Sequence, residues 1–225
     1  MERAEPTAAQ ELDAPAGDRY LVLADISGYT SFMASVEEAH GVDFSEGIPA
    51  AYAVLGALLD GVIEGVAPDF DLVKLEGDAV FACAPAGRLD GRGDLVLERI
   101  RGMYRAFIAN RTRAIPASDH TCTACPNVAY LDLKVVLHRG PAVRQTVGAG
   151  SDLLGPAVTV AHRLLKNTIR PRIGARPYLF VTDAAASGLR LPDVGLHHRE
   201  EYPESAADAA GSAMQWDAGV RRAPG

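Results

Sequence analysis

The stretch Leu23–Phe32, LADISGYTSF, joins a buried strand to a turn and a helix. The preceding residues, RYLV, are apolar and β-rich, so we expect a core strand that ends at Asp25. A carboxylate at the end of such a strand has two explanations. Asp25 either caps the helix that follows, or it binds a metal ion beside a turn whose free N–H groups face phosphate.

The bulk composition indicates one sizeable domain that needs no disulfides. The chain has 225 residues, a formal net charge of −7, 48% hydrophobic residues and three cysteines. The acidic balance argues against nucleic acid as a partner. No apolar run is long enough to span a membrane, and the acidic N-terminus lacks the apolar region of a signal peptide. We therefore expect a cytoplasmic protein that binds neither nucleic acid nor membranes.

The pattern along the chain predicts a flexible leader (1–17), one domain (18–203) and a C-terminal tail (204–225) with little pattern of its own. Within the domain, helical and strand patterns alternate in mixed order, and a tight hairpin turns at Glu76-Gly77-Asp78. A later strand pair is expected to bend at Arg139-Gly140-Pro141. The prediction is an α+β fold, with a mixed β-sheet and helices packed on one face of it.

Asp78 repeats the feature seen at Asp25, because it lies between two apolar stretches, DLVKL and AVFACA. If the first strand pairs with this hairpin, the two aspartates lie side by side. Close carboxylates repel each other unless a cation lies between them, and magnesium suits an all-oxygen site with positions left for phosphate oxygens. The simpler alternative is that each aspartate only forms a turn.

Three motifs in the chain are typical of one known family. LADISGYTSF, VKLEGDAVFA and GPAVTVAHRL resemble, in that order, the three signatures of class III nucleotidyl cyclases, the adenylate and guanylate cyclase catalytic domains. The resemblance covers about Arg19 to Val181. Within the family, the chain is similar to a divergent bacterial branch. It implies the ferredoxin-like cyclase sandwich and a homodimer with its active sites between the chains. It also implies conversion of a nucleoside triphosphate into a 3′,5′-cyclic nucleotide and pyrophosphate, for signal transduction.

The resemblance also implies how the reacting phosphates are held. Asp25 and Asp78 match the two metal-binding aspartates of the family, and the Ile26 carbonyl would add a ligand, so that two Mg²⁺ or Mn²⁺ ions bind. The turn that receives the terminal phosphates is matched by Gly28, Tyr29 and Thr30.

According to the resemblance, residues of other segments recognise the base and stabilise the transition state. Lys74 and Asp152 match the pair with which adenylate cyclases recognise adenine, which favours ATP as the substrate. Arg163 matches the arginine that stabilises charge at the reacting phosphate. Thr159 stands where the family has an asparagine that orients the ribose. Lys74, Asp152 and Arg163 each have an ordinary alternative. Lys74 could be a solubility charge on an edge strand, Asp152 a loop residue, and Arg163 part of a surface ion pair. The adjacent His162 is expected only to pack or to lie at the surface.

A separate motif, DHTCTAC, has the spacing of half a zinc site. Cys122 and Cys125 are separated by two residues, with His120 nearby as a third ligand and His138 on the next strand as a candidate fourth. Two reduced loop thiols are the alternative reading. Taken together, the sequence favours a homodimeric ATP cyclase. The rival hypothesis is a degenerate cyclase fold that binds a nucleotide or a partner without turnover, as the substitution at Thr159 suggests.

Overall fold

The computed structural model describes residues 16–41, 43–45, 50–114, 124–148, 150–167, 169, 177–191, 198–202 and 209–215. Nearly all of the expected leader, most of the expected tail, and His120 and Cys122 of the candidate zinc motif lie outside these residues.

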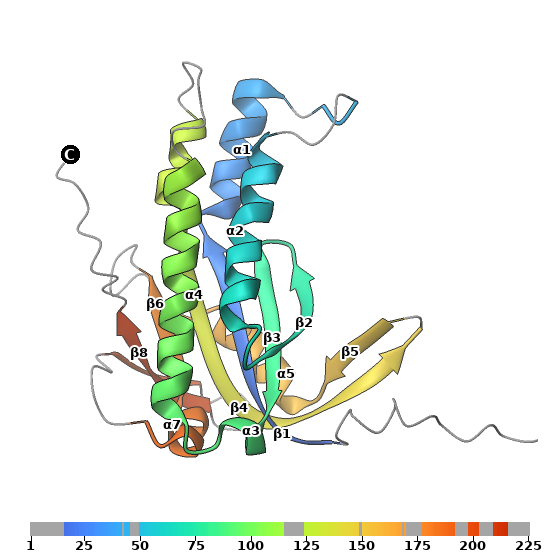
Figure 1. Cartoon of the computed structure of the whole chain (residues 1–225), viewed down its shortest axis with the longest axis vertical. Helices are drawn as coiled ribbons and strands as arrows, with labels where there is room; N and C mark the ends of the chain where they lie inside the picture. Colours follow the sequence, from blue (N-terminus) through green and yellow to red (C-terminus); the bar gives the residue numbers. More distant parts are fainter. Residues whose placement is uncertain are drawn as a thin grey trace, which may run out of the picture.

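The described strands form one mixed sheet, shown in Figure 1. Its order is β2-β3-β1-β4-β6-β8-β7, and β5 pairs with β4 outside this row. All neighbours are antiparallel except β4 and β6, which are parallel. The strands are β1 (Gly17–Ser27), β2 (Asp71–Glu76), β3 (Ala79–Pro85), β4 (Asp132–Val147), β5 (Gly150–Leu154), β6 (Tyr178–Thr182), β7 (His198–Tyr202) and β8 (Ala209–Gln215).

The first strand lies in the middle of the sheet and is buried along most of its length. β1 pairs with β3 on one side and with β4 on the other. Successive side chains of a strand point to opposite faces, and β1 is apolar on both. Tyr20, Val22, Ala24 and Ile26 belong to one core cluster, whereas Leu21 and Leu23 belong to the other. Asp25 therefore continues the row of Leu21 and Leu23.

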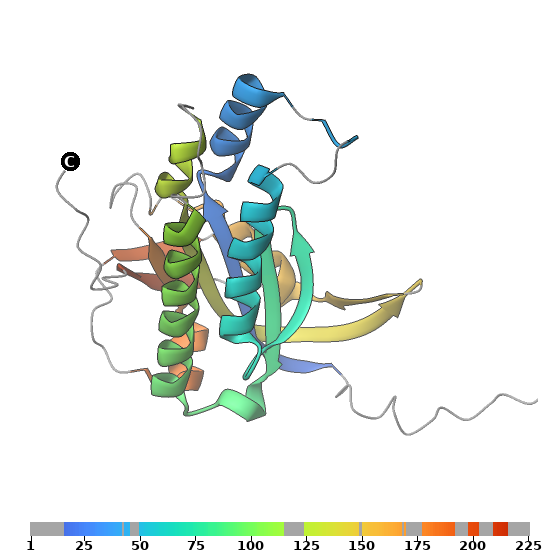
Figure 2. The ribbon, with the colours of Figure 1, turned by 45° about the horizontal axis from the view of Figure 1, so that its top comes forward.

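Helices cover both faces of the sheet, whereas the sequence predicted helices on one face. Figures 1 and 2 show α2 and α4 side by side across one face, and α5 lies against the other. The second core cluster extends over a whole face of the sheet, which explains why α5 buries its own apolar side there. The helices are α1 (Tyr29–His40), α2 (Ala50–Val66), α3 (Ala86–Leu89), α4 (Gly93–Ala114), the 3₁₀ helix η3 (Cys125–Tyr130), α5 (Pro156–Leu164) and α7 (Asp183–Leu189).

The segment expected to be a bent strand pair is one continuous strand, β4, so that prediction is wrong. Gly140 and Pro141 lie within β4 without ending it. A Cβ at Gly140 would lie 3.1 Å from the Cβ of Ala157, so the glycine allows α5 to approach closely. After Ala142 the strand leaves β1 and pairs with β5, so the proline lies next to the point where one neighbour is exchanged for another. The resulting β4–β5 arm extends away from the body of the molecule (Figure 1).

The last strand of the sheet comes from the segment where the sequence showed little pattern. β8 inserts between β6 and β7. Gly211 allows this, because a Cβ there would lie 2.4 Å from the Val181 carbonyl oxygen and 2.7 Å from the Phe180 ring.

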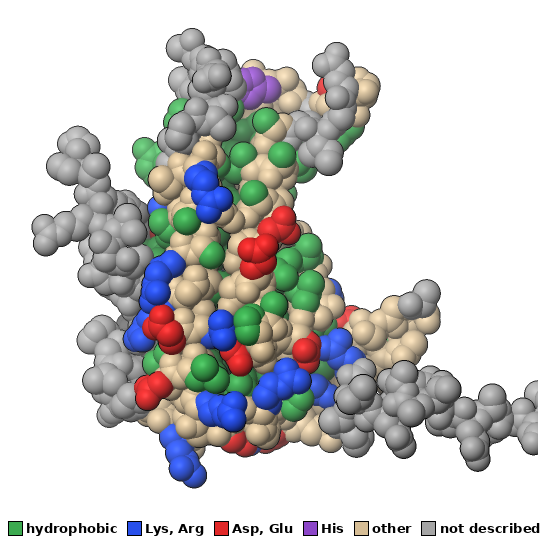
Figure 3. All heavy atoms as spheres, viewed as in Figure 1, with side chains coloured by type: hydrophobic (Ala, Val, Ile, Leu, Met, Phe, Trp, Pro, Cys, Tyr) green, Lys and Arg blue, Asp and Glu red, His purple; other side chains and the backbone are tan. Residues whose placement is uncertain are grey.

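Acidic and basic side chains are interspersed over the face formed by α2 and α4, so this face carries no broad surface of one sign (Figure 3).

Candidate functional site

Asp25 and Asp78 come together at one end of the central strands. Asp25 pairs in register with Ala79 of β3 and with Lys134 of β4. Asp78 lies in the β2–β3 turn, and its carbonyl oxygen accepts a hydrogen bond from the Ile26 N–H at 3.2 Å. Gly77 has a φ of 64°, a conformation that glycine adopts without strain, and this makes the tight turn feasible. The two strand-end carboxylates are therefore neighbours in space.

The electrostatics of this carboxylate pair are those of an incompletely neutralised cluster. Burial, and next the charge of Asp25, raise the pKa of the Asp78 carboxyl, while its own backbone N–H and Lys134 partly offset that rise. Lys134 extends its Nζ to 3.2 Å from Asp25 Oδ1. Asp78 also acts on Tyr29, whose pKa is raised by burial first and then by that carboxylate. The charged form of Asp78 is thus disfavoured unless a further cation is present.

The turn after β1 presents the start of a helix beside these carboxylates. Gly28 has a φ of 91°, and its carbonyl oxygen accepts the first helical bond from the Phe32 N–H at 3.0 Å. No side chain among the described residues caps α1, and its first turn, which includes Tyr29 and Thr30, has no acidic residue. Unpaired N–H groups at a helix start attract anions, and carboxylate capping would compete for them. Asp25 is therefore not the cap of this helix, which was the simpler explanation for it.

Lys74 and Asp152 are brought together from strands far apart in the sequence. Lys74 Nζ lies 3.0 Å from Asp152 Oδ2 and 3.2 Å from Glu76 Oε1. The hydrogen bond from Lys74 is the main cause that lowers the pKa of Asp152, and it also contributes most to raising the pKa of Lys74. The second oxygen of Glu76 lies 3.3 Å from His162 Nδ1, and the His162 ring meets Phe81 edge-on. A lysine thus lies between two carboxylates at the open edge of the sheet.

Thr159 and Arg163 lie one helical turn apart on α5. Both are exposed, whereas Ala157, Val160 and Ala161 of the same helix are buried against the sheet. The structure therefore places these two residues at the molecular surface of a single chain, and their predicted roles depend on what faces that surface.

Three residues of this region were not identified as site residues from the sequence. Lys134 was missed because its closeness to Asp25 depends on the β1–β4 register, which local patterns do not specify. Glu76 was missed because the turn explained it, although it lies two residues after Lys74 on the same face of β2 and contacts it. His162 was expected only to pack or to lie at the surface, and its contact with Glu76 was not foreseen. An acidic side chain two residues after Lys74 was the one available signal.

Part of the candidate zinc motif lies within the structure. Cys125 begins η3, and its Sγ lies 3.4 Å from Nε2 of His40 at the end of α1. The sequence analysis did not select His40. His138 is buried instead against Thr182, with Nδ1 at 3.1 Å from the hydroxyl oxygen. Over the described ranges no three His, Cys, Asp or Glu side chains converge as a metal site would require.

Within the same ranges, no helix combines the length and hydrophobicity of a transmembrane segment.

Solved structures of nucleotidyl cyclases share this fold. A bacterial light-regulated adenylyl cyclase is 16% identical with a TM-score of 0.61; the match covers 89% of this chain and 53% of that one. The guanylyl cyclase Cya2 is 10% identical with a TM-score of 0.62, covering 90% and 93%. The adenylyl cyclase CyaB from P. aeruginosa is 14% identical with a TM-score of 0.61, covering 93% and 98%. The chain thus has the fold of class III cyclase catalytic domains, as the resemblance predicted.

Sequence comparison shows the family. The chain belongs to the family described as "Protein of unknown function (DUF2652)", whose profile matches residues 55–172. An uncharacterized protein of Mycobacterium tuberculosis, Rv2561/Rv2562, is 34% identical over 135 residues, which is 60% of each chain. This chain therefore spans well under two thirds of that relative.

Proposed function

We propose that this protein is a nucleotidyl cyclase that converts a nucleoside triphosphate, preferably ATP, into a 3′,5′-cyclic nucleotide and pyrophosphate. The proposal depends on one observation above all: Asp25 and Asp78 are neighbours, at the end of a cyclase-type sheet and beside an uncapped helix start.

The donor set of this site fits a hard divalent cation. Two carboxylates and a nearby backbone carbonyl, that of Ile26, are oxygen ligands, which Mg²⁺ and Mn²⁺ accept while leaving positions for phosphate and water. Burial, and next the charge of Asp25, raise the pKa of Asp78, and a divalent cation would oppose both by favouring the charged carboxylate. Bound Mg²⁺ or Mn²⁺ would activate the ribose 3′-hydroxyl and stabilise charge on the phosphates. Asp25, Asp78 and Ile26 are the residues that would hold it.

The chain's own residues would orient the triphosphate for in-line attack. The 3′-oxygen loses its proton and bonds to the α-phosphorus, and the bond from that phosphorus to the β-phosphate oxygen breaks, so that pyrophosphate leaves. The N–H groups after Gly28 would bind the terminal phosphates, and Lys134, next to Asp25, would add a positive charge. Arg163 would stabilise the charge that develops on the α-phosphate.

The preference for ATP rests on Lys74 and Asp152. A lysine N–H can donate to a ring nitrogen of adenine, and a carboxylate can accept from its exocyclic amine. Their 3.0 Å contact supports this preference, because two groups so close could both reach one base edge. Guanine presents an acceptor oxygen in place of the amine, so Asp152 would face a second acceptor, which disfavours GTP.

The site would be completed by a second copy of the chain. Arg163 and Thr159 are exposed, as residues that act across an interface would be in a single chain. Apolar side chains are exposed on the edge strand β2 and on the β4–β5 arm: Leu72, Leu75, Val147 and Leu154 are 42%, 48%, 58% and 41% exposed. Burying this surface between two copies would stabilise a homodimer.

A second candidate function is nucleotide binding without turnover. Two observations favour it: Thr159 replaces the asparagine of the family pattern, and Lys134 already forms an ion pair with Asp25. A threonine hydroxyl has one donor where an amide has two, so orientation of the ribose would be less complete. In this case the protein would bind the metal–nucleotide complex but release it unchanged.

The decisive experiment incubates the purified protein with each of the four nucleoside triphosphates and Mn²⁺, and then measures cyclic product by chromatography. Cyclic AMP formation that is lost in Asp78→Asn, but kept in a control variant of the exposed Asp60 on α2, supports the proposal. Metal-dependent nucleotide binding without any product supports the second candidate. If neither binding nor product is found, both are refuted.

A mixing experiment tests the shared site. Asp78→Asn and Arg163→Ala would each be inactive as homodimers. Equal amounts, allowed to exchange subunits, would regain about a quarter of the wild-type activity, because half of the dimers are mixed and each holds one intact site. No regain, despite proven subunit exchange, would place the whole site within one chain.

A further inference from the structure

A polar pocket lies at the other end of the sheet from the carboxylate pair. It has a volume of about 610 Å³ and is lined by Asp90, Gly91, Arg139, Ala184, Ser187, Gly188 and Arg190. Arg139 and Lys134 both belong to β4 and are five residues apart, which corresponds to about 17 Å along a strand. The pocket is therefore separate from the proposed nucleotide site, and nothing in the proposed reaction uses it.

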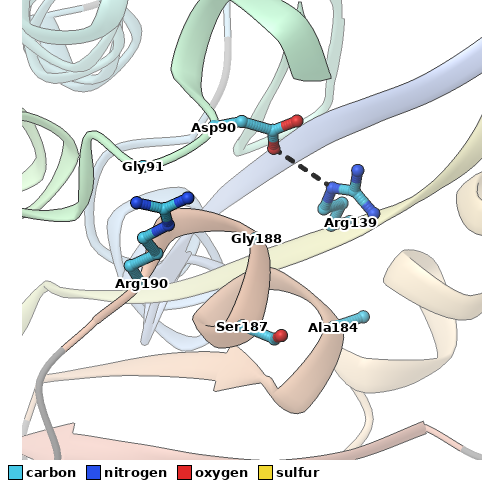
Figure 4. Close-up of a pocket in the computed structure, with 7 residues that line it drawn as sticks. All are labelled: Asp90, Gly91, Arg139, Ala184, Ser187, Gly188 and Arg190. Carbon is cyan, nitrogen blue, oxygen red and sulfur yellow. Dashed lines mark ion pairs between the residues drawn. The ribbon is translucent and has the colours of Figure 1, made fainter.

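Two guanidinium groups face this pocket. Figure 4 shows the guanidinium groups of Arg190 and Arg139 on either side of Gly188, with Asp90 beside Arg139. A Cβ at Gly188 would lie 2.3 Å from the Tyr20 hydroxyl and 2.7 Å from Cδ of Arg139. Glycine at this position therefore lets α7 pack close to β1 and β4, and brings both arginines to one cavity.

The charges in the pocket do not balance. Asp90 is already engaged, since its Oδ1 accepts a 2.6 Å hydrogen bond from Tyr20 and lies 3.4 Å from Nε of Arg139. Arg139 also pairs at 2.8 Å with Asp18, which is 43% exposed and lies outside the lining. Its Nε is buried and has no hydrogen-bond partner of good geometry in the described structure. Arg190 forms no ion pair with any described side chain, so the lining has one positive charge in excess.

The backbone at Arg190 is costly for an arginine. Arg190 ends α7 with a φ of 54° and is the one described non-glycine residue with positive φ. Glycine is the usual residue at such a helix end, because a side chain at positive φ is strained. Strain of this kind is retained mainly where a side chain has a use. The helix end alone does not explain why this position has a guanidinium.

We propose that this pocket binds a small phosphate-bearing molecule. Guanidinium groups match the geometry of phosphate oxygens and bind them through charge-assisted hydrogen bonds. Arg190 supplies the unmatched charge, and the Arg139 guanidinium and the Ser187 hydroxyl lie in the lining of the same cavity. The volume exceeds that of a phosphate ion, so the rest of the molecule would also fit inside. The ligand class is a phosphomonoester or inorganic phosphate.

The test measures inorganic phosphate binding by calorimetry at low salt with EDTA, so that no metal-bound nucleotide site forms. A dissociation constant of about 0.1–1 mM is expected for so small a ligand. Arg190→Asn removes the charge but tolerates positive φ, so it keeps the fold; it would weaken binding at least about tenfold. Arg190→Lys would restore part of the affinity. Arg105→Gln, on the exposed face of α4, would leave it unchanged.

Other ligands then define the class. Ribose 5-phosphate binding more tightly than inorganic phosphate identifies a phosphomonoester pocket, and equal affinities identify a site for the free ion. The proposal is overturned if no phosphate binds, if Arg190→Asn binds as well as the wild type, or if acetate and citrate bind more tightly than either phosphate. Each of these results is independent of whether the protein makes a cyclic nucleotide.

Discussion

The contact between Lys74 and Asp152 allows stability and recognition to be separated. The two atoms are 3.0 Å apart, but the side chains are 37% and 33% exposed, so solvent screens the pair. Exposed ion pairs contribute about 0.2–1 kcal/mol to folding. Glu76 would also still neutralise Lys74 in an Asp152→Ala variant. We therefore expect this variant to lower the melting temperature by about 2–4 °C or less.

The effect on base preference is expected to be larger. If Asp152 accepts from the amine of adenine, its loss leaves a donor of the bound base unpaired, which costs about 1–3 kcal/mol. The affinity for ATP relative to GTP should then fall by about 5- to 150-fold. Lys74→Ala should have a similar effect. Because the two residues act on the same base, the double variant should lose less than the sum of the two single losses.

The assay combines thermal unfolding with competitive binding of ATP and GTP in the presence of Mn²⁺. Asp71→Ala is the matched control, because Asp71 lies on β2, as Lys74 does, and also forms an exposed ion pair, with Arg88 at 3.7 Å. A drop of more than about 5 °C in Asp152→Ala with unchanged base preference would show that the pair is structural. A wild-type protein that binds GTP, UTP or CTP as tightly as ATP would refute the assignment to adenine.

Three further predictions concern the carboxylates, a buried histidine and a thiol. Asp25→Asn and Asp78→Asn should each abolish Mn²⁺-dependent nucleotide binding. Asp78→Asn should also stabilise the metal-free protein at pH 7, because a raised pKa means that the stability present at low pH is lost as the pH rises through it. Burial lowers the pKa of His138 from 6.5 to about 4, so its contribution to stability falls as the pH drops from 6.5 to 4. The loss is up to about 1.4 kcal/mol per pH unit and about 3 kcal/mol in all. Denaturant titrations should show that the free energy of unfolding of His138→Gln depends less on pH over this range. Zinc near one equivalent per chain, measured on untagged protein, should be lost in Cys125→Ser and reduced in His40→Ala.

Each of these has a result that would contradict it. A folded Asp78→Asn protein that still binds Mn²⁺–ATP would place the metal site elsewhere. A His138→Gln variant whose stability falls with pH as steeply as the wild type would assign acid sensitivity to other groups. Protein that contains no zinc, with Cys125 reacting readily with a thiol reagent, would leave this cysteine as an ordinary loop thiol.

The sequence was most informative where the chemistry is local. Asp25 and Asp78 each interrupt an apolar run, and a carboxylate there needs a reason that packing cannot supply. The expected pairing of the first strand with the hairpin, and hence the closeness of the two aspartates, is present in the structure. The helix expected after the turn that follows Asp25 is likewise present, as α1.

The sequence was least informative where a contact depends on register or on a distant segment. Lys134 meets Asp25 only because β4 pairs with β1 in one register, and a shift of one residue would turn it to the opposite face. Arg190 and Arg139 line one pocket only because α7 packs against β1 and β4. β8 was missed because Ala and Gly are poor strand formers, and burial between β6 and β7 overrides that preference. The prediction of a bend in β4 is wrong because Gly140 allows a helix to pack closely, and Pro141 lies next to the point where β4 exchanges one neighbouring strand for another.

The carboxylate pair also bears on the choice between an active and a degenerate cyclase. Keeping Asp78 charged beside Asp25 in a partly buried place destabilises the metal-free fold at neutral pH, and Lys134 relieves this only in part. A protein that needed only the fold would be more stable with an asparagine in place of Asp78. Thr159, by contrast, is exposed on α5, so the substitution there leaves the core unchanged and alters only what the surface can hold. We therefore propose that a cation binds in either case, and that Thr159 determines how fast a bound nucleotide would react. Thr159→Asn is the direct test: a rise in turnover with unchanged metal–nucleotide affinity would assign it that role, whereas equal turnover would remove the main reason to consider the protein degenerate.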